Sequence, residues 1–335
     1  MTHRSATRTD FGAEQQSLGA VIGQATLLDA VSPEKDARML TLFTTPKPFR
    51  GHIDVIQRNA LASWKNLWPD IQVVVFGEEE GAAEACDELG FQHEPNVETT
   101  YTGMKRIDRI FHRAEELAQH PFLCYCNCDI ILPSQFARAV ERVCRNHRKF
   151  LMVGRRWDTP ITEVCRPYSE AIEDGLIQFA HASGVQQPGY SVDYFLFSRG
   201  LYAEMPPLVI GRIWWDHWLV WHARDAGADV VDVSSEVTAI HQNHDYGYHP
   251  EGAKGVWNDE QAVANYNNAG GRWHLYTIDD ATSILESNGE RRNWRRFTAP
   301  YWRYWRPHVI PHWHSFLDAT RSVRHKLGIR KHTIA

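Results

Sequence analysis

Apolar and polar positions alternate along the chain in two different periods from residue 39 onwards. Three apolar runs have the length of β-strands and lie at residues 39–43, 71–77 and 122–126. Between them, apolar residues recur every three or four positions, the period of a helix with one buried face, at residues 53–67, 80–89 and 107–117. This strand–helix–strand order predicts βαβ units, in which helices wrap a mostly parallel sheet.

The same reading extends the α/β pattern to about residue 285. Further strands are predicted at 150–154, 191–197, 230–233 and 237–240, and further helices at 134–144 and 211–226. Residues 165–190 carry weak signals and are predicted to be a loop-and-helix insertion. The predicted organisation is therefore a flexible N-terminal arm, an α/β domain and a basic, Trp-rich tail, at residues 1–37, 38–285 and 286–335.

The overall composition is that of a globular protein, with 43% hydrophobic and 23% charged residues in a chain of 335. Three of the six cysteines, Cys124, Cys126 and Cys128, alternate along one predicted strand and are interpreted as small buried hydrophobic residues. The start of the sequence lacks the apolar core of a signal peptide, and no run of ~20 apolar residues follows. We therefore expect a cytoplasmic protein without a transmembrane span.

The charges are distributed unevenly along the sequence. Residues 291–335 contain eleven Lys or Arg and one acid, although the whole chain has a net charge of −5. Several of the thirteen tryptophans lie among these cations, and Arg with Trp suits the headgroup region of an anionic membrane. Two interpretations stay open: residues 291–331 dock on an anionic membrane surface, which would make the protein peripheral at the inner face, or they pack against the acidic body. Nucleic acid is the disfavoured partner.

Two oxygen-bearing side chains, Asn127 and Asp129, follow the predicted strand at 122–126. They are two positions apart and therefore point the same way in an extended chain. A carboxylate at the end of a buried strand is costly unless a cation meets it, and hard oxygen ligands suit Mg²⁺ or Mn²⁺. The alternative is a strand-end acid that caps the next helix. The carboxyl ends of parallel strands line the ligand crevice of such sheets, where the loop after residue 43 also opens.

Five motifs in order carry a resemblance to a known family: Thr44-Thr-Pro-Lys, Asn127-Cys-Asp, Val192-Asp-Tyr-Phe-Leu-Phe, Trp215-Asp-His-Trp-Leu and His241-Gln-Asn-His-Asp. Over residues 38–285 the chain resembles GT-A-fold glycosyltransferases of the nucleotide-diphospho-sugar transferase group, similar to glycosyltransferase family 2. The resemblance implies a GT-A-type, Rossmann-like mixed sheet, mostly parallel and flanked by helices. The Asn-x-Asp sequence stands where the family has Asp-x-Asp, which lowers the charge of the site by one.

The resemblance also implies roles for individual residues. Asp129 would bind Mn²⁺ or Mg²⁺, together with one or both of His241 and His244. Asp216 would be the base that deprotonates the acceptor in an inverting reaction, although an Asp at this position could also simply cap a helix. Asp193 and Trp215 would contact the acceptor. The donor would be held by Thr44, Thr45, Lys47, Lys105, Asp108, Asn127, Arg156 and Asp158, some of which could equally be solvated surface residues.

The function these features predict is transfer of a sugar from a nucleoside diphosphate sugar to a hydroxyl of a glycan or lipid-linked glycan, with a metal ion. A non-catalytic glycan- or membrane-binding protein on a degenerate transferase scaffold is the alternative from another class. A sugar-phosphate nucleotidyltransferase is less favoured, because residues 44–48 contain no glycine-rich phosphate loop.

Overall fold

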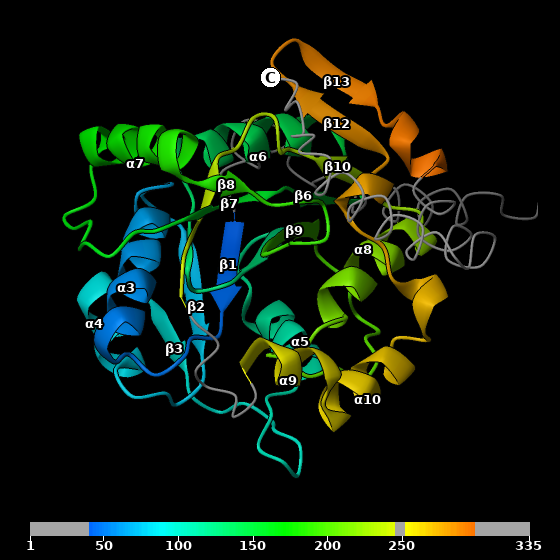
Figure 1. The fold of residues 1–335 in the computed structure, drawn as a ribbon, viewed down its shortest axis with the longest axis horizontal. Helices are drawn as coiled ribbons and strands as arrows, with labels where there is room; N and C mark the ends of the chain where they lie inside the picture. The colour runs from blue at the N-terminus through cyan, green and yellow to red at the C-terminus, as the bar shows by residue number, and fades with distance from the viewer. Residues whose placement is uncertain (1–39, 245–251, 299–335) are drawn as a thin grey trace, which may run out of the picture.

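The centre of the protein is a nine-stranded sheet, seen in the computed structural model, which describes residues 40–244 and 252–298 (Figure 1). The strand order is β13-β12-β10-β6-β9-β4-β1-β2-β3. In chain order these strands are β1 (Leu40–Thr44), β2 (Gln72–Phe76), β3 (Gln92–Glu94), β4 (Phe122–Cys126), β6 (Phe150–Val153), β9 (Tyr194–Ser198), β10 (Asp229–Asp232), β12 (Ser283–Glu286) and β13 (Gly289–Arg292).

Most neighbouring strands of this sheet are parallel. β3, β2, β1 and β4 run the same way, as do β6, β10 and β12. β9 runs antiparallel to both β4 and β6, and β13 runs antiparallel to β12. The predicted mixed, mostly parallel sheet is therefore confirmed. Because β9 is reversed, its first residues, and not its last, lie beside the carboxyl end of β4.

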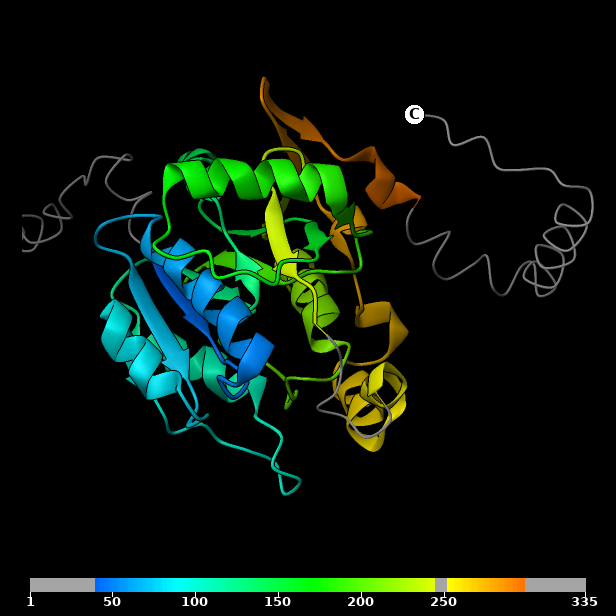
Figure 2. The same ribbon diagram turned by 60° about the vertical axis from the view of Figure 1, so that its left-hand side comes forward.

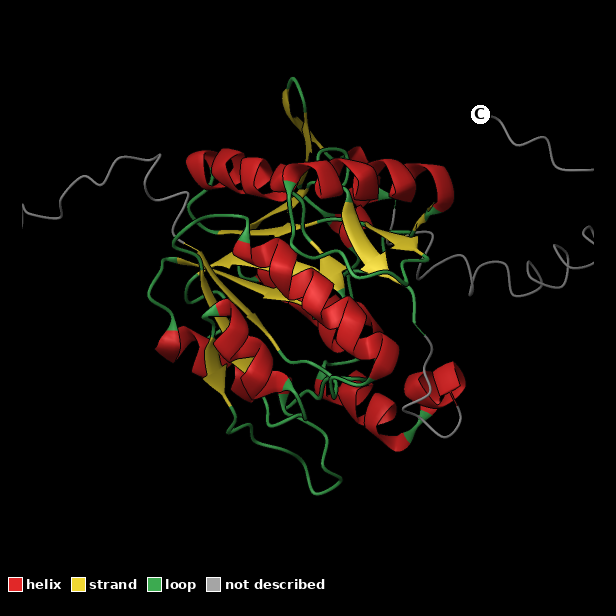
Figure 3. Ribbon diagram, turned by 90° about the vertical axis from the view of Figure 1, so that its left-hand side faces the viewer, coloured by secondary structure: helices red, strands yellow, loops and turns green. Residues whose placement is uncertain are grey.

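Helices cover both faces of the sheet (Figure 3). Alternate residues of each strand point to opposite faces, so each strand contributes to two apolar layers. Packed against one face are α3 (Gly51–Lys65), α4 (Ala82–Leu89) and α6 (Ser134–Asn146). Packed against the other are α5 (Ile107–Leu117) and α8 (Trp215–Asp225). The helices predicted at 53–67, 80–89, 107–117 and 134–144 thus form close to their predicted positions.

A second, four-stranded sheet lies beside the first and was not predicted as a unit. Its order is β5-β11-β7-β8, formed by β5 (Ile130–Ile131), β11 (Ala239–Gln242), β7 (Arg156–Thr159) and β8 (Val185–Gln186). Helix α7 (Glu170–Ser183), within the predicted insertion, packs on it through Leu176 and Ala180. In this sheet His241 lies opposite Ile130 on one side and Asp158 on the other, which brings β11 to the end of β4.

The last described part of the chain contains short elements. These are α9 (Gly252–Asn258), α10 (Glu260–Asn268) and the 3₁₀ helices η1 (Arg272–His274), η2 (Ile278–Asp280) and η3 (Trp294–Phe297). The hairpin of β12 and β13, coloured orange, projects at the top of Figure 2. It carries the sheet to Arg292, past the predicted domain boundary at residue 285, because β13 pairs with β12 along its whole length.

Helix α8 is shorter than predicted. The helix predicted over 211–226 begins only at Trp215, because Gly211 and Trp214 adopt positive φ angles of 80° and 91° that no α-helix accommodates. The predicted arm at 1–37 and most of the predicted tail, 299–335, lie outside the described residues. Within residues 40–244 and 252–298, no helix combines the length and the apolar character needed to cross a membrane.

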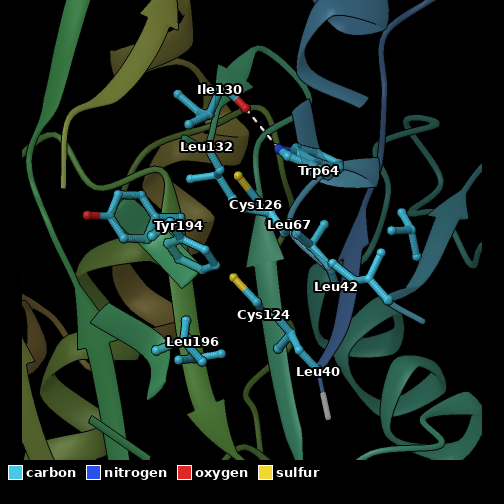
Figure 4. Close-up of a cluster of buried hydrophobic side chains, with 14 of the residues drawn as sticks. Leu40, Leu42, Trp64, Leu67, Cys124, Cys126, Ile130, Leu132, Tyr194 and Leu196 are labelled. Carbon is cyan, nitrogen blue, oxygen red and sulfur yellow. Dashed lines mark hydrogen bonds between the residues drawn. The ribbon is translucent and has the colours of Figure 1, made fainter. Parts of the chain in front are cut away.

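The cysteines of β4 contribute to the core, as predicted. Cys124 and Cys126 point to the face covered by α3, where they pack in one apolar cluster with Trp64 (Figure 4). The indole Nε1 of Trp64 donates a hydrogen bond to the carbonyl oxygen of Ile130 at 3.0 Å. This bond ties α3 to the segment that follows the end of β4, next to the candidate site.

We expect Trp64→Phe to lower the free energy of unfolding by about 2 kcal/mol, because a buried hydrogen bond and part of the indole packing are both lost. Chemical denaturation of the variant and the wild type measures this. Trp294 is 64% exposed and provides the matched control, since Trp294→Phe should change the same quantity by less than about 0.5 kcal/mol. Equal losses in the two variants would contradict the role given to the Trp64 bond.

Candidate active site

A cavity of about 580 Å³ opens where β1 and β4 end and β9 begins. Eleven of the fourteen residues singled out from the sequence line it: Thr45, Lys47, Lys105, Asn127, Asp129, Arg156, Asp193, Trp215, Asp216, His241 and His244. The topology explains the convergence, because β1 and β4 are parallel neighbours and β9 reaches the same edge from the opposite direction.

Three potential metal ligands meet in this cavity. One ligand atom each from Asp129, His241 and His244 lies within 4.8 Å of the other two. The backbone brings them together, since the amide of Gln242 donates to the carbonyl oxygen of Asp129 at 3.2 Å and β11 pairs with β5. One carboxylate and two imidazoles form a mixed oxygen and nitrogen donor set, which can bind Mn²⁺ as well as softer divalent ions such as Fe²⁺ and Zn²⁺.

The hydrogen bonds around Asp129 test whether such an ion fits. Its Oδ1 is buried and has no hydrogen-bond partner among the described residues. The Nε2 atom of His244 lies 3.0 Å from Asp129 Oδ2 and 3.1 Å from the Nζ atom of Lys47. The carboxylate calls for a proton on Nε2, whereas the ammonium group calls for a lone pair there. A divalent cation bound by the carboxylate and by the Nε2 lone pair would take the place of the proton between them, and the Lys47 ammonium would then need another acceptor, such as a phosphate oxygen. With the buried Oδ1 of Asp129, unpaired among the described residues, these residues fit a metal.

His241 is oriented from behind by a second carboxylate. Its Nδ1 lies 3.0 Å from Oδ1 of Asp158, and its Nε2 lies 3.9 Å from Oδ2 of Asp129. The nearby carboxylate favours a proton on Nδ1, although the two atoms are not aligned as a hydrogen bond, and a neutral ring then carries its lone pair on Nε2. This is the tautomer that a metal-binding histidine needs. Asp158, predicted to hold the donor, therefore lies behind His241 and not in the lining of the cavity.

The charge of Asp129 is strongly stabilised. Burial by itself would raise the pKa of this carboxyl. The hydrogen bond with His244, the electrostatic influence of His241 and the charge of Lys47 outweigh that cost and hold the pKa well below its usual range. The side chain of Asp129 is therefore an ionised carboxylate at neutral pH.

Two lysines, Lys47 and Lys105, bring positive charge to the cavity. The backbone of Lys47 is held by Gln57, which accepts from the Lys47 amide at 2.6 Å and donates to its carbonyl oxygen at 2.8 Å. Lys105 Nζ donates to Thr45 Oγ1 at 2.6 Å and forms an ion pair with Glu79. Burial lowers the pKa of Lys105, while Glu79 acts in the opposite direction.

The centre of the cavity wall is a network of hydrogen bonds. Asn127 Nδ2 donates to Asp193 Oδ1 at 2.7 Å, and Asn127 Oδ1 accepts from the Tyr125 hydroxyl at 3.1 Å. Arg156 Nη1 donates to both oxygens of Asp193 at 2.8 Å each, and its Nε donates to Asp158 at 2.8 Å. Asp193, predicted to contact the acceptor, is thus tied into this wall through Asn127 and Arg156.

Asp216 lines another part of the cavity, in the first turn of α8. Its Oδ1 is buried and has no hydrogen-bond partner among the described residues, and His217 Nε2 lies 3.9 Å from its Oδ2. Burial raises the pKa of Asp216; His217 and the backbone amides of the turn act in the opposite direction, and the nearby Asp193 adds to the rise. A carboxylate with these properties is suited to accept a proton. The helix cap is Trp214, so Asp216 is not itself the N-cap residue.

The turn before α8 is fixed by a residue that comes much later in the chain. Asn265 on α10 is buried; its Nδ2 donates to the carbonyl oxygens of Val209 and Ile213 at 2.9 and 3.1 Å, and its Oδ1 accepts from the Val209 amide at 2.9 Å. Trp214, with its φ of 91°, packs against Tyr266 with a ring-centroid distance of 5.7 Å. Sequence reasoning gave no signal for Asn265, because its partners are about fifty residues away.

Thr44 and Asp108, like Asp158, lie away from the cavity lining, and several lining residues were missed. Thr44 is fully buried in β1, and Asp108 is bound by Arg106 through two hydrogen bonds of 2.7 Å. The missed residues include Gln57, Glu79, Arg212 and Trp257. Trp257, on α9, is 54% exposed, and α9 had no recognisable pattern in the sequence.

No family model matches the sequence, and no curated protein matches it. Among solved structures, the chain is similar to glucosyl-3-phosphoglycerate synthase from Mycobacterium tuberculosis in complex with Mg²⁺ and uridine diphosphate, at 13% identity over 72% of this chain and 83% of that one, with a TM-score of 0.44. It is also similar to S. aureus TarS 1–349, at 12% identity over 61% of this chain and 60% of that one, with a TM-score of 0.41. Both neighbours are GT-A-type glycosyltransferases, the class that the sequence motifs resemble.

The metal cluster leads to a direct prediction. Saturating Mn²⁺ should raise the thermal midpoint by roughly 5 °C or more, because a ligand that binds only the folded state adds to its stability. The shift should disappear in Asp129→Asn, measured by differential scanning fluorimetry with and without the metal. Asp54→Asn is the matched control, because Asp54 pairs with Arg58 on α3, outside the cavity lining, and should keep the full shift. A shift of the same size in Asp129→Asn would place the metal elsewhere.

Proposed function

We propose that this protein is a metal-dependent glycosyltransferase that uses a nucleoside diphosphate sugar. The observation that carries the proposal is that one cavity contains both the Asp129, His241 and His244 cluster and Asp216. Burial raises the pKa of the Asp216 carboxyl. Glycosyl transfer from a nucleoside diphosphate sugar needs positive charge at the diphosphate leaving group, and acceptor activation needs a base; the cavity offers residues for both.

The proposed chemistry is a direct displacement. A Mn²⁺ or Mg²⁺ ion held by the cluster would neutralise charge on the diphosphate. Lys47 and Arg156, both in the lining, would bind its oxygens. Asp216 takes the proton of the acceptor hydroxyl, whose oxygen forms the new bond to the anomeric carbon while the bond to the diphosphate breaks. The nucleoside diphosphate leaves with the bonding electrons, and the anomeric configuration inverts.

The acceptor is proposed to be a glycan or lipid-linked glycan. Trp215 and the half-exposed Trp257 line the cavity together with Asp216, and indole rings stack on the apolar faces of sugar rings. A binding protein on a degenerate scaffold is the competing hypothesis. It assigns no proton transfer to Asp216, whereas the transferase proposal uses the raised pKa of this carboxyl directly.

A panel of nucleotide sugars with Mn²⁺ or Mg²⁺, followed by the release of nucleoside diphosphate, tests the function. We expect release from at least one donor, and Asp216→Asn should slow it by roughly 10²–10⁴-fold. The rate of the wild type should fall at acidic pH, because the base works only when it is ionised. The midpoint of this fall should lie above the usual carboxyl pKa of ~4, because the pKa of Asp216 is raised.

Stability provides the control for the same variant. A carboxyl whose pKa is raised by folding destabilises the protein once pH exceeds its unfolded pKa, so Asp216→Asn should keep or raise the thermal midpoint at pH 7. Release that is unchanged in Asp216→Asn would remove it as the base. If no donor of the panel released nucleotide, the binding-protein hypothesis would be favoured.

We also propose that the protein docks on anionic membranes, and the described start of the basic tail supports this. Trp294 and Phe297 on η3 are 64% and 57% exposed, and the guanidinium of Arg292 lies over both rings, 5.1 and 5.8 Å from their centroids. Arg291 and Arg295 are exposed beside them. Exposed aromatic rings among arginines match the interface of an anionic bilayer.

Co-sedimentation of the full chain with vesicles tests the docking. We expect binding to phosphatidylcholine mixed with phosphatidylglycerol, and little binding to phosphatidylcholine alone. Arg295→Ala should weaken binding about fivefold, in line with ~1 kcal/mol for each cation near such a surface. Trp273→Ala removes an indole that is 60% exposed outside η3 and β13 and should have no effect. Equal effects of the two variants would contradict docking through this patch.

A further inference from the structure

Asn127 stands where the resembling family has an acid, and both ends of its side-chain amide are engaged. Nδ2 donates to Asp193 Oδ1 at 2.7 Å, and Oδ1 accepts from the hydroxyl of Tyr125 at 3.1 Å. The backbone amide of Asn127 also donates to the carbonyl oxygen of Asp193 at 2.9 Å. These two residues therefore face each other across the end of the β4–β9 pair.

The chemistry of the partners fixes the orientation of the amide. The carboxylate of Asp193 only accepts hydrogen bonds, so the NH₂ group must face it. Tyr125 is fully buried, and burial raises the pKa of its hydroxyl, which therefore stays protonated and donates to the amide oxygen. An amide held in this way has its oxygen directed at a buried phenol and not at the metal cluster.

Asp193, the hydrogen-bond partner of Asn127, also binds Arg156. Asp193 is only 5% exposed and binds Nη1 of Arg156 through both of its oxygens, while Asp158 binds Nε. The guanidinium is thus held between two carboxylates in the wall of the cavity. Asp158 also contacts His241, so the arginine connects the Asn127 side of the site with the metal cluster.

We propose that Asn127 is a positioning residue: it orients the carboxylate of Asp193, which in turn holds the Arg156 guanidinium in the cavity wall, and it binds neither the metal nor the nucleotide. The acid absent from position 127 is supplied from the opposite strand, by Asp193. This inference rests on the proposed function for its effect on turnover, and on the hydrogen bonds alone for its effect on stability.

A carboxylate at position 127 would be incompatible with this arrangement. It would face Asp193 at the present distance of 2.7 Å, where two buried acids cannot both be ionised. It would also compete with Asp193 for Arg156. Asn127→Asp, which restores the acid-x-acid motif in the sequence, is therefore expected to impair the protein and not to improve it.

The test is a charge-swap cycle in the full chain: Asn127→Asp, Asp193→Asn, the double variant with both changes, and the wild type. We expect each single variant to lower nucleotide release about 10-fold or more and to lower the thermal midpoint. The double variant again pairs one amide with one carboxylate and should recover most of both losses. Asn96→Asp, at an exposed site outside the cavity lining, controls for the added charge.

Binding of Mn²⁺ alone, measured by calorimetry, separates positioning from ligation. Asn127→Asp should not bind Mn²⁺ more tightly than the wild type does. Tighter binding, or faster nucleotide release, would show that position 127 faces the metal and would overturn the proposal, as would a double variant that recovers neither loss. If the wild type released no nucleotide at all, the proposed function would fail, while the thermal midpoints of the cycle would still decide whether Asn127 holds Asp193.

Discussion

The burial of the Asp129 carboxylate is the constraint on which the site depends. A buried anion requires positive charge or a metal ion close by. Here Lys47 lies in the loop after β1, His241 lies on β11, and His244 lies two residues after the end of β11. These segments are separated by up to about two hundred residues in the sequence. The hydrogen bond from the backbone amide of Gln242 to the carbonyl oxygen of Asp129 joins β11 to the segment after β4. Backbone contacts of the fold therefore also bring the site residues together.

The reversed strand β9 gives the site its second half. In a purely parallel sheet, every functional residue would follow the end of a strand. Here Asp193 precedes a strand, and the pairing of Cys126 with Tyr194 places it directly against Asn127. The wall of the cavity is thus made from the end of one strand and the start of its neighbour, and the hydrogen bonds between Asn127 and Asp193 hold the two together.

The periodic parts of the fold were predictable from the sequence, because strands and helices with a buried face leave a repeating apolar pattern. The residues at strand ends were predictable too, since Asn127 and Asp129 interrupt an apolar run. The second sheet was not, because β5 and β8 have two residues each and no measurable period. The role of Asn127 was equally hidden: the sequence shows an amide in place of an acid, but not that Asp193 lies 2.7 Å away.

The dependence of the α8 turn on α10 has a consequence for how the chain can be divided. The left-handed backbone of Trp214 is unfavourable by roughly 1–2 kcal/mol and persists only if its surroundings hold it. Those surroundings are Asn265 and Tyr266, about fifty residues downstream. A fragment that ended after His244 would contain every acid and histidine of the site and would still let the turn relax, which would displace Asp216. The active-site turn therefore depends on the chain as far as Tyr266 on α10, beyond the last candidate metal ligand.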